Sequence, residues 1–138
     1  MSNYYKFLKT ELNNYAGKFD RSILYIPDFF KLLCSLIDER NIDKEDKSNI
    51  YASLAYFVIP NDIIPEDIYG PAGYIDDMFV CVVVLEKLRN KYGIKLLEKH
   101  WKEDEDLADV LKLCLQKSKQ MLSEKNLIES TLKAANLD

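Results

Sequence analysis

Residues 51–85 constrain the fold of this chain most, because they place a rigid, acidic loop between two apolar segments. Three of the four prolines and two of the four glycines fall in the middle of this stretch: Pro60, Pro65, Pro71, Gly70 and Gly73. Five carboxylates share the same region: Asp62, Glu66, Asp67, Asp76 and Asp77. Proline restricts the backbone and glycine permits tight corners. If the chain has a specific site, it is expected here.

The bulk composition is that of a folded, globular chain. With 138 residues it is long enough to bury a core, and a single domain over residues 1–138 is predicted. Apolar residues make up 48% and charged residues 30%, which is not the balance of a disordered chain. The formal net charge of −4 argues against a nucleic-acid partner, whose phosphates attract basic surfaces.

The apolar segments and the cysteine and histidine residues of the sequence limit which cellular location and which metal site can be expected. The first residues carry no apolar segment of the secretory type. The longest uninterrupted apolar run, residues 78–85, is far shorter than the roughly 20 residues that a membrane-spanning helix needs. Three scattered cysteines and one histidine give no scaffold for a zinc site and indicate reduced core thiols. A cytoplasmic protein is predicted, with peripheral contact to a membrane as an alternative.

Apolar residues recur at helical spacing along nearly the whole chain, which predicts an all-α fold. The expected architecture is a compact bundle of about six or seven helices around a central helical hairpin. The expected helices cover residues 2–16, 27–40, 43–59, 74–90 and 94–101, then one opening at residues 103–106 and one from about residue 123. In the second of them, Phe29, Leu33, Leu36 and Ile37 would face the core.

The third and fourth helices are expected to form the central hairpin. Tyr51, Ala55 and Ile59 extend the apolar stripe of the third helix to most of its sides towards its end, which predicts central burial. The fourth segment is rich in valine, a residue that favours strands. We nevertheless predict a helix, because Asp76 and Asp77 suit a helix N-terminus and no partner strand exists elsewhere. Gly93 is expected to close this helix.

The motifs of the acidic loop resemble a known bacterial family. Residues 60–66 read PNDIIPE and residues 73–77 read GYIDD, between two apolar helices. This pattern resembles the YkvA-like family, also called domain of unknown function 1232, over residues 48–90. The sequence departs from the family pattern at Glu66, where an Asp is usual, and the interval between the motifs is one residue longer. The resemblance implies a helical hairpin, sometimes associated with membrane proteins, and no known catalytic activity.

The carboxylates of the loop permit two interpretations. In the first, Asp76 and Asp77 cap the fourth helix, Asp62 forms a turn after Pro60, and the loop is architecture alone. In the second, Asp62, Glu66, Asp76 and Asp77 converge on a divalent cation, Mg²⁺ or Ca²⁺, which prefers oxygen ligands. Such a site could support phosphoester hydrolysis. The capping interpretation accounts for the fixed residue types without any ligand and is the one we favour.

A basic strip follows the hairpin. Lys87, Lys91 and Lys95 recur at four-residue spacing, which places lysines on one side of a helix. The strip could contact anionic lipid or another partner. The alternative, which we favour, is a solvated surface, because Glu86 and Glu98 interleave with the lysines.

These observations predict a non-catalytic helical interaction module with no catalytic residues and no required cofactor. A protein partner or self-association is expected, with a membrane surface as a further partner. The first alternative is the acidic-loop metal site with hydrolytic chemistry. The second is a peripheral membrane protein that uses the lysine strip.

Overall fold

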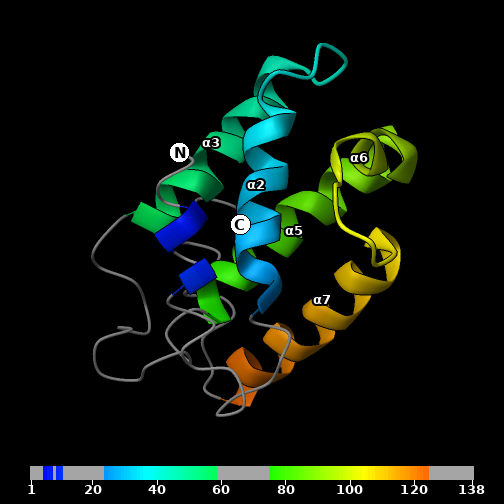
Figure 1. The fold of residues 1–138 in the computed structure, drawn as a ribbon. Helices are drawn as coiled ribbons and strands as arrows, with labels where there is room; N and C mark the ends of the chain where they lie inside the picture. The colour runs from blue at the N-terminus through cyan, green and yellow to red at the C-terminus, as the bar shows by residue number, and fades with distance from the viewer. Residues whose placement is uncertain (1–4, 8, 11–23, 59–74, 125–138) are drawn as a thin grey trace.

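The computed structural model describes residues 5–7, 9–10, 24–58 and 75–124. Within these ranges every regular element is a helix and no residue lies in a strand, which confirms the all-α class. The labelled helices are α2 (Ile26–Leu36), α3 (Lys44–Val58), α5 (Ile75–Tyr92), α6 (Ile94–His100) and α7 (Leu107–Glu124) (Figure 1). Residues 5–7 and 9–10 are also helical. The number of domains in the whole chain stays a prediction.

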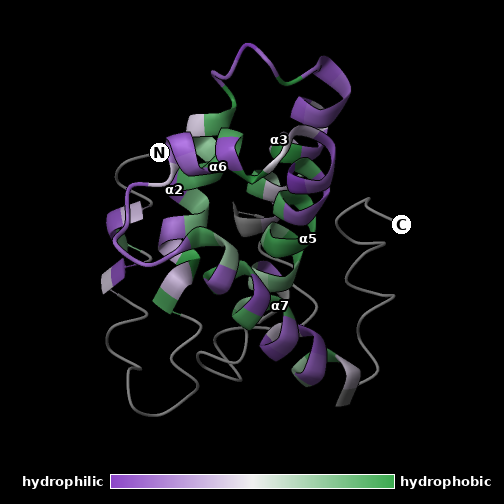
Figure 2. Cartoon of the chain, turned by 90° about the vertical axis from the view of Figure 1, so that its right-hand side faces the viewer, coloured by the Kyte–Doolittle hydropathy of each residue, from purple (hydrophilic) through white to green (hydrophobic). Residues whose placement is uncertain are grey.

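Helix α5 is the centre of the packing, because it contacts each of α2, α3, α6 and α7. Its side chains from residue 77 to residue 82 are all buried, and Val84, Leu85 and Leu88 are at most 2% exposed. Figure 2 shows apolar residues gathered on the sides of the helices that face the middle. The valine-rich segment is therefore the helix that was predicted. No helix among the described residues is both long and apolar enough to cross a membrane.

Helix α2 begins as predicted and ends earlier. Pro27 occupies its first turn, where the missing backbone N–H costs nothing. The predicted core residues Phe29, Leu33 and Leu36 are fully buried, whereas Ile37 is only partly buried.

The predicted end of this helix, at residue 40, is wrong, because α2 ends at Leu36. The backbone N–H groups of Asp38 and Glu39 bond to carbonyls three residues earlier, which tightens the chain into turns. Only 4% of the Glu39 side chain is exposed. The chain leaves the helix where this carboxylate enters the interior.

The central burial predicted for the third helix is true of one side only. Ile50 and Leu54 are buried, at 0% and 4% exposed, as part of the core shared with α2 and α5. Tyr51 is 55% exposed and Ala55 is also exposed, so the predicted burial is wrong for these two residues, and Ile59 lies outside the described residues. Residue type alone does not tell which side of a helix its neighbours cover.

Helices α3 and α7 begin with the same capping device. The Asp43 carboxylate accepts the backbone N–H of Asp46 at 2.9 Å, and the Asp106 carboxylate accepts that of Asp109 at 3.1 Å. Each bond satisfies a backbone donor that the first turn of a helix leaves free. Helix α7 therefore begins after the acidic run 103–106, not within it. It also continues through residue 123, where a further helix was expected to start.

Gly93 separates α5 from α6, as predicted. Its φ is 92° and its ψ is 153°, a combination that essentially only glycine adopts. Its backbone N–H donates to the Arg89 carbonyl at 2.8 Å, which closes the last turn of α5. The chain can therefore turn sharply and direct α6 back against α2 and α5.

Candidate functional site

The four carboxylates of the predicted metal site are not brought together by the part of the chain that the structure describes. Asp62 and Glu66 lie outside the described residues, as does the side chain of Asp76. Asp77 lies in the first turn of α5 and is 1% exposed. Within the described ranges, no group of three or more His, Cys, Asp or Glu side chains could hold a metal ion. The metal site stays a prediction.

The predicted lysine strip is divided between two helices and partly neutralised. Lys87 and Lys91 lie on α5, and Lys95 lies on α6 beyond the turn at Gly93; all three lysines are exposed. Lys91 forms ion pairs with Asp43 at 2.8 Å and with Asp46 at 2.6 Å. Its ammonium group is therefore already occupied by two carboxylates of α3 and its cap.

The two carboxylates and Tyr92 complete a cluster between the start of α3 and the end of α5. The Tyr92 hydroxyl donates to the Asp46 carboxylate at 2.6 Å and accepts the backbone N–H of Asp43 at 3.0 Å. The hydrogen bond from Lys91 lowers the pKa of Asp43 to about 2 and the same contact raises the pKa of Lys91. The cluster fixes one end of the α3–α5 pair. The sequence analysis did not predict the contact of these carboxylates with Tyr92.

A second cluster, around Glu39, was missed by the sequence reasoning. The Glu39 carboxylate accepts hydrogen bonds from His100 Nε2 at 2.9 Å, from Lys99 Nζ at 3.2 Å and from the Asn41 backbone N–H at 3.1 Å. The bond from His100 is the main reason why the pKa of Glu39 falls to about 2. A carboxylate only accepts hydrogen bonds, so Nε2 carries the proton of the imidazole.

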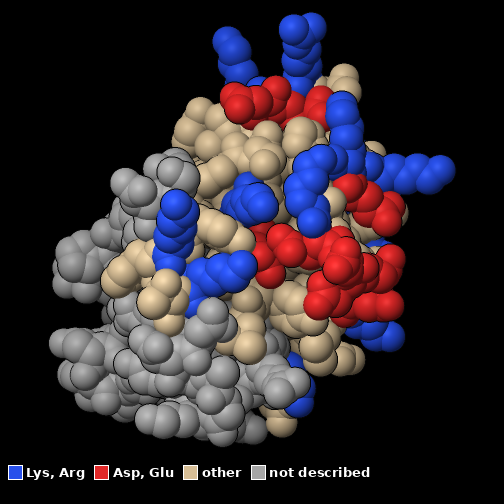
Figure 3. All heavy atoms as spheres, viewed as in Figure 1, with Lys and Arg blue, Asp and Glu red and all other residues tan. Residues whose placement is uncertain are grey.

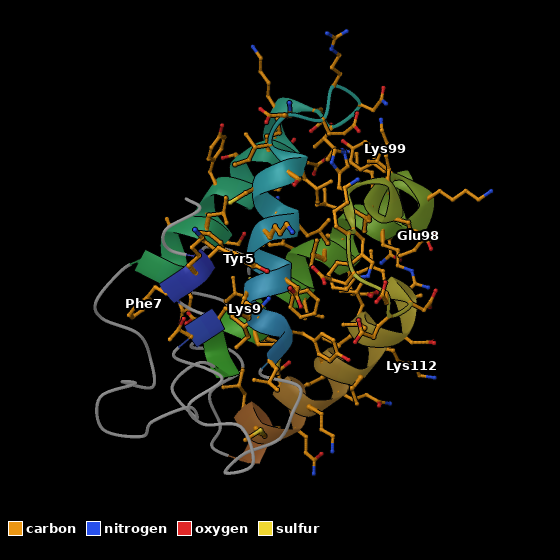
Figure 4. The ribbon with its side chains drawn as sticks, viewed as in Figure 1. Tyr5, Phe7, Lys9, Glu98, Lys99 and Lys112 are labelled. Atoms are coloured by element: carbon orange, nitrogen blue, oxygen red, sulfur yellow. The ribbon has the colours of Figure 1, made fainter. Side chains whose placement is uncertain are left out.

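The Glu39 cluster joins the turn after α2 to the end of α6, where Figure 4 labels Lys99. Its partners are about 60 residues apart in the sequence, as the separations of 60 for Lys99 and 61 for His100 show. His100 as the only histidine was visible in the sequence. Nothing in the spacing pointed to Glu39 as its partner.

A shallow groove of about 390 Å³ lies between α5 and α7. It is lined by Glu86, Arg89, Ala108, Asp109, Lys112, Leu115 and Gln116. The acidic and basic side chains balance, and Arg89 is itself 3.4 Å from the Glu86 carboxylate. The groove therefore has no single charge preference. Lys112 points outward from α7 in Figure 4.

The outer side of α3 exposes apolar residues, among them Tyr51 at 55% exposed. Exposed residues recur along it at spacings of four, three and four: Lys44, Ser48, Tyr51 and Ala55. This spacing places them in one row on the helix; we call it the α3 outer row. The row is polar at the start of the helix and apolar in its second half. In Figure 3, charged residues of both signs gather in the upper and right-hand parts of the visible surface, with uncharged residues between them.

Comparison with known proteins is consistent with this architecture. The family model described as "Protein of unknown function (DUF1232)" matches residues 47–83, which include most of α3 and the first half of α5. The uncharacterized protein ORF9 of Methanothermobacter thermautotrophicus is 31% identical over 137 residues, which are 99% of this chain and 92% of that protein. No solved structure matches the chain. The family model matches the loop motifs together with most of α3 and the first half of α5. This match shows that the chain belongs to the DUF1232 family.

Proposed function

We propose that this chain is a non-catalytic helical module that binds a protein partner through the α3 outer row. The observation that carries the proposal is Tyr51, which is 55% exposed within the segment matched by the family model. Ala55 is exposed one turn further on, so the two residues form a continuous apolar strip. Tyrosine is enriched in protein interfaces because it combines a large apolar ring with a hydroxyl that tolerates water.

The chemistry of the described charged clusters supports a structural role for them. General acid–base catalysis works best when the pKa of the catalytic group lies near the working pH. Glu39 and Asp43 have pKa values near 2, because each carboxylate is held by hydrogen-bond donors. They remain ionised at neutral pH and join helices instead of exchanging protons. The Nε2 atom of His100 is engaged with Glu39.

A peripheral membrane role through the lysine strip receives less support. Lys91, the middle residue of the strip, already pairs with two carboxylates. An anionic lipid would have to compete with them, so the attraction expected from three aligned lysines is reduced.

The first test is self-association of the purified chain, since a second copy is the simplest protein partner. Sedimentation velocity over a range of concentrations should show an oligomer that Tyr51→Glu weakens at least tenfold. Tenfold weakening corresponds to about 1.4 kcal/mol, a reasonable loss for one interface tyrosine. Leu113→Glu is the matched control, because Leu113 is an exposed apolar residue, 39% exposed, on α7.

If the chain is monomeric, the partner is a different protein. A photo-crosslinking amino acid placed at position 51 in cells should then capture a defined protein, and the same group at position 113 should not. Binding of that purified protein should be weakened by Tyr51→Glu and not by Leu113→Glu. A monomer that gives the same crosslinks from both positions would contradict the proposal.

A second candidate function is the acidic-loop divalent-metal site. The observation in its favour is the burial of Asp77, since a carboxylate that is 1% exposed needs a compensating charge or hydrogen bonds. A cation that binds only the folded chain must raise its unfolding temperature. Metal-stripped protein should therefore melt higher with Mg²⁺ or Ca²⁺, and Asp77→Asn should lose the increase. An equal melting temperature with and without each cation would remove this candidate.

A further inference from the structure

The helical residues near the N-terminus are held on α2 through the ring of Tyr5. The ammonium group of Lys31, on α2, lies 5.5 Å from the centre of this ring. The ammonium group of Lys9 lies 5.8 Å from the same centre. A positive charge this close to the face of an aromatic ring is attracted by it. Two lysines from different elements are thus gathered around one partly buried ring that packs against the core.

The opposite side of these residues carries an exposed aromatic ring among lysines. Residues two positions apart on a helix point to roughly opposite sides, so Phe7 points outward where Tyr5 points inward. Phe7 is 53% exposed, and in Figure 4 it lies at the outer edge of the molecule, away from α2. Three lysines around it are exposed as well: Lys6, Lys9 and Lys31. We call Phe7 and these three lysines the N-terminal basic surface.

The lysines of the N-terminal basic surface are not neutralised in the way that Lys91 is. Lys91 is held by two carboxylates, at 2.8 Å and 2.6 Å. The ion pairs among the described residues join other groups, and none of them includes Lys6, Lys9 or Lys31. These three ammonium groups therefore remain available to an anionic partner.

An acidic residue of α2, Asp28, lies near two of these lysines. Burial, then Glu103, raise the pKa of Asp28, whereas Lys9 and Lys31 lower it. Asp28 is partly buried and forms an ion pair with neither lysine among the described contacts. One such carboxylate beside three exposed ammonium groups leaves the described part of this surface positive.

An anionic lipid surface fits this combination of side chains. Each lysine close to such a surface strengthens binding about fivefold. An aromatic ring without a polar group enters the boundary between the lipid phosphates and the acyl chains. The whole chain carries a net charge of −4, so an anionic surface attracts it only where lysines gather. An acidic protein would attract the same lysines but has no general use for the exposed ring of Phe7.

We propose that the N-terminal basic surface binds the phosphate-bearing face of an anionic membrane. Lys6, Lys9 and Lys31 contact the phosphates, and the Phe7 ring lies at the boundary with the acyl chains. The chain then lies on the membrane without crossing it. This surface differs from the predicted strip of Lys87, Lys91 and Lys95, and it does not rest on the role proposed for the α3 outer row.

Co-sedimentation of the full chain with lipid vesicles tests the proposal. Vesicles of phosphatidylglycerol and phosphatidylcholine in equal amounts should bind the chain at about 0.05 M salt, and vesicles of phosphatidylcholine alone should not. Binding should fall at least tenfold at about 0.5 M salt, because salt screens the attraction between exposed charges. Absence of binding to the anionic vesicles at low salt would overturn the proposal, and so would equal binding to both kinds of vesicle.

One charge reversal and its matched control locate the surface. Lys6→Glu leaves the contacts of Lys9 and Lys31 with Tyr5 in place, and it should weaken binding to the anionic vesicles at least fivefold. Lys95→Glu makes the same change in net charge at an exposed lysine of α6 and should bind as the wild type does. Equal weakening by both variants would show that the net charge of the chain is responsible, which would overturn the proposed surface. Circular dichroism melting verifies that both variants are folded.

Substitutions of Phe7 test whether its ring reaches the acyl chains. Phe7→Gln should weaken binding at least threefold, because it removes the apolar ring. Phe7→Trp should bind at least as well as the wild type, and its emission should move to shorter wavelength on anionic vesicles. Lipids brominated in the acyl chains should quench this emission, whereas Trp101, the only tryptophan of the wild type, should not be quenched.

Bound Phe7→Trp that brominated lipid does not quench would overturn the proposed position of the ring. Polyglutamate in place of the vesicles tests the alternative of an acidic protein partner. If wild type bound polyglutamate as tightly as the anionic vesicles and Phe7→Gln weakened neither, the surface would be a site for acidic proteins and the membrane proposal would fail.

Discussion

The Tyr92 hydroxyl donates a 2.6 Å hydrogen bond to the Asp46 carboxylate, and the two residues are 46 positions apart in the sequence. The same hydroxyl accepts the backbone N–H of Asp43, the residue that caps α3. One side chain at the end of α5 thus connects the cap of α3 with the first turn of α3. This contact joins the two helices of the central pair at this end.

Tyr92→Phe should lower the unfolding temperature while leaving the helices intact. The substitution keeps the ring and removes both hydrogen bonds, and the carboxylate of Asp46 retains its ion pair with Lys91. The loss should therefore be modest, on the order of a few degrees. Circular dichroism melting of the variant measures it. Tyr51→Phe, which removes an exposed hydroxyl from α3, is the matched control and should unfold at the same temperature as the wild type.

The sequence predicted the elements of this hairpin better than the contacts between them. The valine-rich segment was correctly assigned to a helix, because Asp76 and Asp77 mark an N-terminus and no partner strand exists. Gly93 was correctly placed at its end. These signals are local, so they can be read from neighbouring residues. The contact of Tyr92 with Asp46 depends on how two helices pack, which local spacing does not reveal.

The same limit explains the errors at α2 and α3. The end of α2 was placed too late, at residue 40, because the basic Arg40 suits the negative end of a helix, whereas the structure turns Glu39 inward toward His100. The side of α3 that carries Tyr51 was predicted to be buried because it is apolar. Its exposure depends on where α2 and α5 lie. Of the candidate metal ligands, only the burial of Asp77 can be described, and that burial agrees with both the capping and the metal interpretation.

Glu39→Gln should destabilise the fold at neutral pH and lose its effect in acid. The bonds from His100, Asn41 and Lys99 lower the pKa of Glu39 from 4.5 to about 2. A lowered folded-state pKa adds stability that is complete above the unfolded value and is lost as the pH falls through the folded value. The difference in unfolding temperature between wild type and variant should therefore be largest above about pH 5 and shrink steadily toward about pH 2.

Melting curves of both proteins across this acid range measure the effect. Glu98→Gln is the matched control, because Glu98 is an exposed acid of the same helix as His100. The difference in unfolding temperature between Glu98→Gln and wild type should not shrink toward acid pH. A Glu39→Gln difference that stayed constant from neutral pH to strong acid would contradict the ion-pair assignment.

Asp28→Asn should have the opposite pH dependence. The pKa of Asp28 is raised from 3.8 to about 6, chiefly by burial and then by Glu103. A folded state that binds the proton more tightly than the unfolded state loses stability as the pH rises from 3.8 to about 6. The variant escapes this loss, so its stability relative to wild type should increase between acid and neutral pH. Because Asp28 is only partly buried, solvent screening limits the increase to about 1 kcal/mol.

Urea unfolding of wild type and Asp28→Asn at about pH 4 and about pH 7.5 provides the two stability differences. Subtracting the stability difference at about pH 4 from that at about pH 7.5 removes any effect of the substitution that does not change with pH. The free energy of unfolding of Asp28→Asn relative to wild type should increase as the pH rises. A stability difference that moved the other way would show that Asp28 is held as a carboxylate by Lys9 and Lys31.

Gly93→Ala should destabilise the chain through its backbone alone. The φ of 92° and ψ of 153° lie in a region that side chains with a Cβ rarely adopt. A Cβ built at this position meets no atom within 4 Å, so steric contact with neighbours adds nothing to the strain. The cost should be about 1–3 kcal/mol.

Gly93→Asn should cost a similar amount, because asparagine is tolerated in left-handed helical conformations and not in this extended one. Chemical unfolding of both variants measures the cost, with Asn90→Ala on the exposed side of α5 as the control. If Asn proved much better tolerated than Ala at position 93, the turn between α5 and α6 would adopt the ordinary left-handed cap in solution.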